Sequence, residues 1–183
     1  MSLTALILAG GKSSRMGQDK AFIPWNGKRF IEHSIAAADS VASRVVLSGD
    51  KQRLTFLGLK VIEDVETDQG PVYALASCFS QIADKKVLVL SCDVPQVSSE
   101  DLQVLIKKND TSADVTCFKY KNKAMPLVGI YNRSAFEAFK HAMKNKERKL
   151  FSVLNHLKVK TVEYKGEGGL MNINTPEDVK ALI

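Results

Sequence analysis

The sequence predicts an α/β fold in which a mostly parallel central sheet is covered by helices on both faces, with a mixed part towards the C-terminus. Short apolar runs alternate with helical patterns from the first residues to Lys107, which is typical of a parallel sheet with crossover helices. Beyond Asp114 the pattern changes, because two runs separated by lysine-rich turn residues predict a hairpin.

Each predicted strand is a short run, rich in β-branched or apolar residues and bounded by glycine, proline or polar residues. The run 4–8 is apolar throughout and ends at glycines, so we expect it to be a fully buried strand. The predicted strands, in chain order, span residues 4–8, 44–48, 58–64, 86–93, 114–119, 126–132 and 159–164. Residues 21–25 and 170–174 are expected to be short extended pieces.

The predicted helices begin at recognisable start signals. Ser98 or Ser99 is a suitable N-cap, Pro71 stands near the first turn of a helix, and Thr175 precedes a proline and two acids. Asn26-Gly27 is a strong turn signal before the first helix. The predicted helices span about 30–42, a short stretch after residue 50, 71–82, a stretch after residue 98, 134–144, 149–156 and a final one from residue 176.

Length and composition indicate one globular domain over residues 1–183. The three cysteines are far apart, with no Cys-x-x-Cys pair. This spacing argues against a disulfide framework or a zinc site and favours the reducing cytoplasm. We expect no secretory signal, because Met1-Ser2 leads directly into the first strand, and no apolar run approaches the length of a membrane span.

The net charge of +6 is concentrated between Lys107 and Lys149, where basic residues outnumber acidic ones. A basic region of this kind binds nucleic acid in some proteins and attracts phosphorylated small molecules in others. Its lysines fall mostly at a predicted hairpin tip and a helix end, where they are normally solvated. We therefore expect neither nucleic acid nor a membrane as a partner.

The loop that follows the first strand has the composition of a polyphosphate-binding loop. Its glycines allow the backbone to approach a ligand closely, and Lys12, Arg15 and Lys20 supply positive charge. The loop is not a Walker A motif, because Leu6 stands where that motif needs glycine, and Lys12 excludes the dinucleotide-binding pattern. A solvated βα loop is the alternative.

Asp93 is the best candidate for a catalytic residue, because it follows the most β-like run and precedes Val94-Pro95, where the chain must leave the sheet. Ligands of doubly wound sheets bind at this edge. A carboxylate there, beside a polyphosphate loop, is suited to Mg²⁺, which prefers oxygen ligands. The alternative is an aspartate that caps the next turn.

Three further polar residues are expected at the same edge. Asp64 also ends a predicted strand, and it either accepts hydrogen bonds from a base or ribose or is solvated. Asn172 and Asn174 share a face of an extended segment, since alternate side chains point the same way. Their amides either complete a metal site or bind ligand hydroxyls, or they form a turn before the last helix.

The sequence offers no readable serine–histidine–aspartate triad, because its three histidines lie away from predicted strand ends. The remaining functional groups are cations, a carboxylate for a metal and glycine-lined backbone. Such a set transfers phosphate-linked groups by positioning and charge neutralisation.

Four motifs resemble those of the nucleotidyltransferases of the MobA group, the molybdenum cofactor guanylyltransferases. The first is Leu8-Ala9-Gly10-Gly11-x-Ser13-x-Arg15-Met16-Gly17-x-Asp19-Lys20. The others are Gly70-Pro71, Cys92-Asp93-x-Pro95 and Asn172-x-Asn174-Thr175-Pro176, and the resemblance runs from residue 3 to residue 183. The Ala-Gly-Gly form resembles the guanylyl branch, since cytidylyl relatives more often have Ala-Ala-Gly.

The resemblance implies a three-layer, Rossmann-like nucleotidyltransferase fold. It also implies that the protein transfers GMP from Mg·GTP to the terminal phosphate of molybdopterin, with or without molybdenum, and releases pyrophosphate. The nucleophile would be the acceptor's own ionised phosphate oxygen. Other proteins of molybdenum cofactor biosynthesis, or acceptor proteins, would be possible partners.

The resemblance also assigns roles to individual residues. Arg15, Lys20 and Asp93 would be catalytic, with the two cations on the triphosphate and Asp93 on Mg²⁺. The expected nucleotide-binding residues are Leu8, Ala9, Gly10, Gly11, Lys20, Ser48, Asp64, Gly70, Pro71 and Asp93. Asn172 and Asn174 would lie near the metal and the acceptor.

The chain departs from the family pattern at three places. Ser48 stands where the family often has an asparagine that contacts the nucleotide, Val72-Tyr73-Ala74 replaces Leu-Ala-Gly, and Met125 replaces a polar residue. Two alternative functions therefore remain open. One is a nucleotidyltransferase that uses CTP or acts on a sugar phosphate, and the other is a nucleotide-binding module without catalysis.

Overall fold

The computed structural model describes residues 2–10, 19–64, 66, 69–166 and 169–182. Its centre is a seven-stranded sheet, with a separate two-stranded ribbon of β2 (Pro24–Trp25) and β3 (Lys28–Arg29). The strands of the large sheet, in spatial order, are β5 (Lys60–Ile62), β4 (Arg44–Ser48), β1 (Thr4–Leu8), β6 (Lys86–Ser91), β8 (Lys123–Asn132), β7 (Val115–Tyr120) and β9 (Val159–Glu163).

Strand β1 lies in the middle of the parallel part of the sheet, and every one of its residues is buried. Thr4 pairs in register with Arg44 of β4 on one side and with Val87 of β6 on the other. A strand that is apolar on both faces must be covered on both faces. The continuous apolar run of the sequence therefore correctly predicts a central, fully buried strand.

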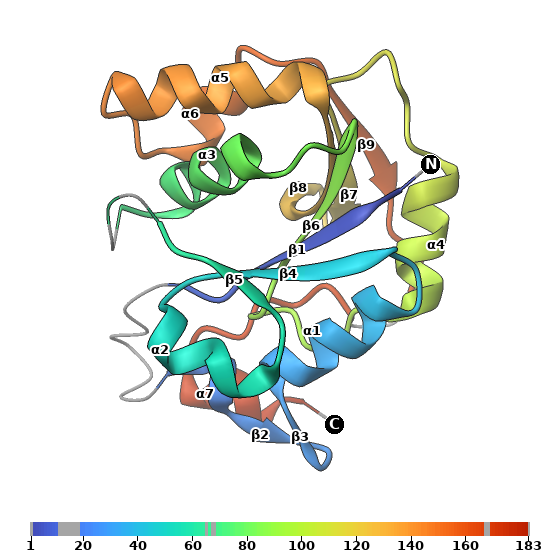
Figure 1. Cartoon of the computed structure of the whole chain (residues 1–183). Coiled ribbons are helices and arrows are strands. Elements are labelled where there is room, and N and C mark those ends of the chain that lie inside the picture. The colour runs from blue at the N-terminus through green and yellow to red at the C-terminus, as the bar shows by residue number, and fades with distance from the viewer. Residues whose placement is uncertain (1, 11–18, 65, 67–68, 167–168, 183) are drawn as a thin grey trace.

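Helices cover both faces of the sheet, so the fold has the three layers that the sequence predicts (Figure 1). Side chains from α1 and α4 pack on one face, and side chains from α3, α5 and α6 pack on the other. The helices are α1 (Phe30–Asp39), α2 (Lys51–Leu54), α3 (Pro71–Gln81), α4 (Ser99–Lys107), α5 (Arg133–Lys144), α6 (Leu150–Leu154) and α7 (Pro176–Lys180), with 3₁₀ turns η1 (Lys20–Phe22) and η2 (Thr55–Leu57).

The mixed part of the sheet is the hairpin of β7 and β8. Strand β8 runs antiparallel to both β6 and β7, and β9 is parallel to β7 at the far edge. The hairpin turn consists of Lys121 and Asn122, which both have positive φ angles of 48° and 62°. Two left-handed residues match the twist of a tight hairpin, so the change of pattern in the sequence correctly predicts the mixed part.

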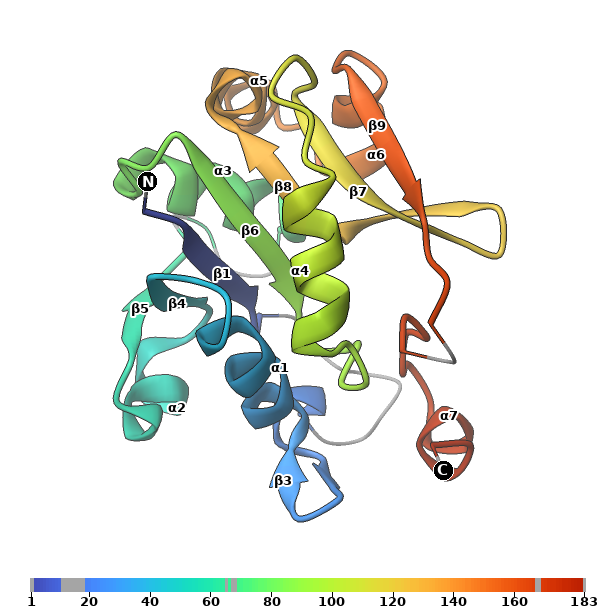
Figure 2. The ribbon, with the colours of Figure 1, turned by 90° about the vertical axis from the view of Figure 1, so that its right-hand side faces the viewer.

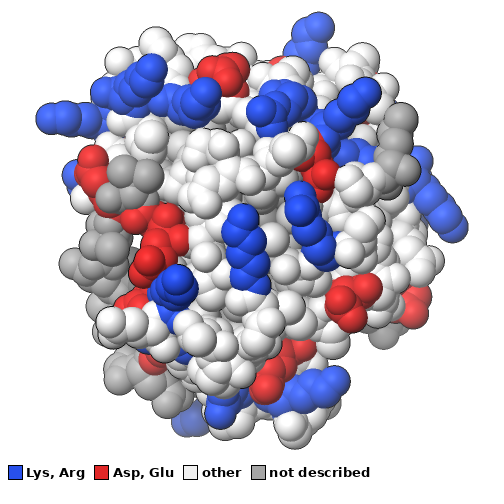
Figure 3. Space-filling model, viewed as in Figure 1, with Lys and Arg blue, Asp and Glu red and all other residues white. Residues whose placement is uncertain are grey.

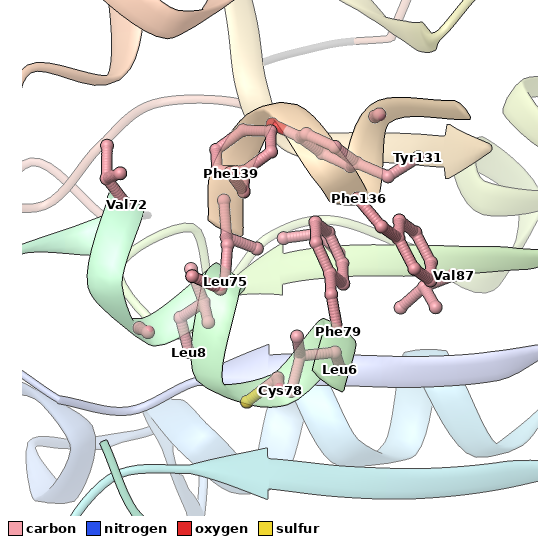
Figure 4. Close-up of a cluster of buried hydrophobic side chains, with 14 of the residues drawn as sticks. Leu6, Leu8, Val72, Leu75, Cys78, Phe79, Val87, Tyr131, Phe136 and Phe139 are labelled. Carbon is pink, nitrogen blue, oxygen red and sulfur yellow. The ribbon is translucent and has the colours of Figure 1, made fainter. Parts of the chain in front are cut away.

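An aromatic cluster fills the core between the sheet and the layer of α3 and α5. The rings of Phe79 and Phe136 are stacked, with centroids 4.1 Å apart, and Phe139 and Tyr131 meet them edge-on or tilted (Figure 4). Tyr73 of α3 belongs to the same cluster and is 2 % exposed. Truncating a buried Phe of this kind typically costs about 3–5 kcal/mol.

The structure differs from the sequence-based expectation at several element ends. Helix α1 ends at Asp39 instead of near residue 42, and β5 begins at Lys60 instead of residue 58. Ala21 and Phe22 belong to a 3₁₀ turn that Asp19 caps, which the apolar run alone does not reveal. No helix in the described part of the chain is long and apolar enough to cross a bilayer.

Candidate active site at the carboxyl edge of the sheet

The carboxyl ends of four neighbouring strands meet at one edge of the sheet (Figure 1). Leu8, the last residue of β1, is level with Ser48 of β4 and with Ser91 of β6, and Ser48 is in turn level with Ile62 of β5. The residues that follow these strands therefore share one edge, which is where open α/β sheets bind ligands.

Lys20, Asn174 and Asp93 come together at this edge from three distant parts of the chain. The Lys20 ammonium donates a hydrogen bond to the side-chain oxygen of Asn174. The backbone N–H of Ile173 donates to the carbonyl oxygen of Asp93 at 2.8 Å, which fixes the segment before α7 against the end of β6. The structure therefore brings together three residues that the sequence analysis names as candidates for the site.

Asp93 has a partly buried carboxylate. Burial raises the pKa of Asp93 above its ordinary value, while a hydrogen bond from Ser91 and the positive charge of Lys20 act in the opposite direction. Lys20 therefore interacts electrostatically with Asp93 and also forms the hydrogen bond to Asn174. A cation, a carboxylate and an amide oxygen form the centre of the candidate site.

The position of Asn174 depends on the cap of α7. The backbone N–H groups of Asn174 and Thr175 both donate to Oδ2 of Asp178 at 2.8 Å, and the Thr175 hydroxyl accepts from the Asp178 N–H at 3.2 Å. This reciprocal capping box orders the segment that carries Asn174. Asn172, in contrast, has an exposed side chain.

A second polar cluster lies at the ends of β4 and β5. The Ser48 hydroxyl donates to Oδ1 of Asp64 at 3.1 Å, and the other carboxylate oxygen lies 3.8 Å from where a Cβ on Gly10 would stand. Burial raises the pKa of Asp64, and the hydrogen bond from Ser48 partly offsets this. The absence of a side chain at Gly10 leaves the carboxylate accessible from the loop.

The main chain of Leu8 and Ala9 forms the fixed base of the loop. The Ala9 N–H donates to the Ser48 carbonyl at 2.8 Å, and the Leu8 carbonyl accepts from the Cys92 N–H at 3.2 Å. The side chains of Leu8 and Ala9 are buried on opposite faces of the sheet. Gly10 is the first exposed residue after β1.

Gly70 and Pro71 form the start of α3, as the sequence predicts. Gly70 has φ +85° and ψ −176°, a conformation that strongly favours glycine. A Cβ at Gly70 would stand 3.9 Å from the carbonyl oxygen of Arg148, so this turn lies beside the loop between α5 and α6. The bulky Tyr73 points into the core and is buried.

Two predicted site residues, Gly11 and Arg15, lie outside the described residues, as does Lys12. The sequence reasoning in turn missed Arg53. Its guanidinium forms an ion pair with Asp19, the cap of the turn that carries Lys20. The spacing of these residues gives no signal of this contact, because it depends on how α2 packs beside the 3₁₀ turn that Asp19 caps.

Among the residues that the structure describes, no group of three His, Cys, Asp or Glu side chains is placed to hold a metal ion. A site with Asp93 as its single carboxylate is nevertheless compatible with Mg²⁺. This ion usually keeps several waters and is bound through one or two carboxylates and the phosphates of a substrate. The donor set therefore fits a magnesium ion that is shared with a nucleotide.

The model of the MobA-like NTP transferase domain matches residues 5–161. The chain belongs to this family. Members of the MobA-like family are nucleotidyltransferases, so the chain is an enzyme of this class. The expectation from the four motifs is confirmed at the level of family and reaction class.

Curated relatives of this MobA-like chain match it along its whole length. A protein of Carboxydothermus hydrogenoformans named "Probable molybdenum cofactor guanylyltransferase" is 33 % identical over 189 residues, covering 100 % of this chain and 95 % of the relative. A Flavobacterium johnsoniae protein of the same name is also 33 % identical, covering 99 % and 96 %.

A solved structure shares the fold. The crystal structure of molybdopterin-guanine dinucleotide biosynthesis protein A from Archaeoglobus fulgidus aligns with a TM-score of 0.82 at 23 % identity, and covers 97 % of this chain and 95 % of that one. The predicted fold class, a mostly parallel α/β nucleotidyltransferase fold, is thereby confirmed.

Proposed function

We propose that this protein transfers GMP from GTP to the terminal phosphate of molybdopterin, with or without bound molybdenum, and releases pyrophosphate. The observation that carries the proposal is the contact of Lys20 with Asn174 beside Asp93. The names of the full-length relatives support the choice of guanine and of molybdopterin.

The reaction is an in-line displacement at the α-phosphorus of the nucleotide. An oxygen of the acceptor phosphate forms the new P–O bond, and the bond from the α-phosphorus to the bridging oxygen of the β-phosphate breaks. The electron pair of that bond leaves with pyrophosphate. A phosphate monoester is already ionised near neutral pH, so the residues of the site need not remove a proton from it.

Lys20 neutralises negative charge on the triphosphate, and Arg15 is proposed to share this role. The ammonium of Lys20 is held in place by Asn174, so its charge is positioned before the substrate arrives. Asp93 would hold Mg²⁺, which, when bound, supplies positive charge at the phosphoryl oxygens. Gly10 and Gly11 would bring backbone close to the phosphates.

The nucleoside is proposed to lie over β4 and β5. Asp64 is an acceptor for ribose hydroxyls or for the N–H groups of a base, and Ser48 orients its carboxylate. Leu8 and Ala9 would form the floor through their backbone, and Gly70 with Pro71 would border the base. Asn172, whose side chain is exposed, would contact the acceptor.

The protein is further proposed to act in the cytoplasm as a single domain, and other molybdenum cofactor proteins are proposed partners for delivery of the acceptor or uptake of the product.

Two other functions make different predictions. A relative that uses CTP or a sugar phosphate would release pyrophosphate with another pair of substrates, and a binding module would release none.

One assay separates the three possibilities. The purified protein is incubated with Mg²⁺ and with each of the four nucleoside triphosphates in turn, and the acceptor is molybdopterin, a sugar phosphate or absent. Pyrophosphate is measured. Release that requires both GTP and molybdopterin supports the proposal. Release with CTP or with a sugar phosphate, or tight GTP binding without any release, contradicts it.

A further inference from the structure

A groove of about 590 Å³ lies between the end of α4 and the edge strand β9. The last residue of α4 and the loop after it line one side, and residues 160–163 together with Lys165 line the other. Figure 2 shows α4 over the sheet, with β7 between it and β9. None of the residues that line the groove belongs to the candidate active site.

The outer edge of β9 is open to a further strand. Within the described part of the chain, β9 pairs only with β7. The Val115 N–H donates to the carbonyl oxygen of Lys158, and the Tyr164 N–H donates to the carbonyl oxygen of Lys119. The backbone N–H and C=O groups of the even-numbered residues between 158 and 164 therefore point towards β7. Backbone groups alternate along a strand, which turns those of Thr161 and Glu163 outward, as unpaired groups at a sheet edge.

Positive charge predominates in the groove beside β9. Lys107, Lys108 and Lys165 line the groove, are exposed, and have no ion pair among the described residues. The two acids of the groove are already paired, Asp110 with Lys160 at 3.3 Å and Glu163 with Lys119 at 2.8 Å. The groove therefore favours a negatively charged occupant.

We propose that this groove and the outer edge of β9 bind an extended, acidic segment of a partner protein, which adds to the sheet as an eighth strand. Backbone hydrogen bonds to Thr161 and Glu163 give the segment its register. Its carboxylates lie near Lys107, Lys108 and Lys165.

Two other occupants fit the groove less well. A second copy of this chain would bring the same lysines together, and each copy already has a net charge of +6. Single-stranded RNA is bound mainly by aromatic stacking and cations, yet no aromatic side chain lines the groove and two carboxylates do. An acidic polypeptide satisfies both the charge and the open edge.

The test uses the whole protein and a fluorescent nine-residue peptide in which glutamate alternates with valine, measured by fluorescence anisotropy. Lys107→Glu combined with Lys165→Glu is expected to weaken binding at least tenfold. The control, Lys28→Glu combined with Lys144→Glu, makes the same charge change on exposed lysines elsewhere, and Lys144 ends α5 as Lys107 ends α4. It is expected to change binding less than twofold.

A second peptide tests strand addition itself. N-methylation of alternate backbone nitrogens keeps the charge but removes the donors, so binding should fall at least tenfold, and amide exchange at Thr161 and Glu163 should slow only with the unmodified peptide. Equal binding of both peptides, equal binding by both double variants, or displacement of the peptide by single-stranded RNA would overturn the proposal. Thermal unfolding of the variants excludes misfolding as the cause.

Discussion

The ammonium of Lys20 is hydrogen-bonded to the side-chain oxygen of Asn174, a residue 154 positions further along the chain. The contact joins the end of the glycine-rich loop to the segment before α7, and both segments lie beside Asp93. The candidate active site is therefore complete only when β1, β6 and the segment before α7 have all reached their places.

Replacing Asp93 by asparagine is expected to lower the rate of nucleotidyl transfer about 10²–10³-fold, because a neutral amide binds Mg²⁺ far more weakly than a carboxylate does and no longer balances Lys20. The folded state should be as stable or slightly more stable, since burial disfavours the charge of Asp93. Steady-state kinetics and thermal unfolding measure the two effects. Glu63→Gln, an exposed acid near the same edge, serves as the control.

Replacing Asp178 by alanine is expected to lower activity several-fold although Asp178 is not assigned to the reaction. The change removes both hydrogen bonds that order Asn174 and Thr175, and with them one half of the capping box of α7. Asp114→Ala is the matched control, because Asp114 accepts from the backbone of Lys158 at 2.8 Å at the opposite edge of the sheet. An equal loss of activity in both variants would mean that Asp178 acts only through stability.

Replacing Ser48 by alanine is expected to raise the KM for the nucleoside triphosphate about 3–10-fold with little change in kcat. The Ser48 hydroxyl orients Asp64, and a hydrogen bond of this kind contributes about 1 kcal/mol. Loss of binding in the ground state and the transition state alike changes KM and leaves kcat unaltered. Ser34→Ala removes another buried hydroxyl and should leave both constants unchanged. A fall in kcat alone would contradict this role.

Replacing Asp84 by asparagine is expected to lower the free energy of unfolding at pH 7 by about 1–2 kcal/mol. Hydrogen bonds from Ser2 and Thr4, together with the charge of Arg44, lower the pKa of Asp84 below the ordinary value of an aspartate. The stabilisation is thus fully present above that value and is lost as the pH falls through the lower folded-state pKa. The free energies of unfolding of the wild type and of Asp84→Asn, measured with urea from pH 7 to pH 2, should become equal only in acid. The free energy of unfolding of Asp39→Asn should equal that of the wild type throughout.

The three thiols are expected to resist alkylation in the folded protein. Cys78, Cys92 and Cys117 are free and buried, and burial raises the pKa to about 12 for Cys78 and Cys92 and to about 11 for Cys117. At pH 8 almost no thiolate is present, and thiolate is the reactive form. Iodoacetamide followed by mass spectrometry should label none of the three before urea is added and all three afterwards. Rapid labelling of one cysteine would show that its site opens.

The sequence predicted the strands well where an element has a strong local signal. The continuous apolar run of β1 and the positive-φ turn at Lys121 and Asn122 are both local features. The end of α1 was predicted less well, because the alanine run at residues 36–38 favours a longer helix while the chain must turn into β4 after Asp39. That turn depends on tertiary packing.

The same distinction applies to the candidate site. Asp64 and Asp93 could be proposed from the sequence, since each follows a recognisable strand. The ion pair of Arg53 with Asp19 could not, because it joins helix α2 to the cap of the 3₁₀ turn η1, and the approach of these two elements is fixed only by the packed structure. The capping box of α7 was visible in the sequence, but its effect on Asn174 was not.

The position of β1 has a mechanical consequence. Its neighbours β4 and β6 both run parallel to it and are paired with it over its full length. A force that pulls β1 along its own axis must break its hydrogen bonds to β4 and to β6 at the same time. An ATP-driven unfoldase that pulls on the segment before β1 therefore meets its greatest resistance at this strand. One that pulls on the segment after α7 first unfolds this short helix, and it detaches Asn174 from Lys20 before the sheet is disrupted.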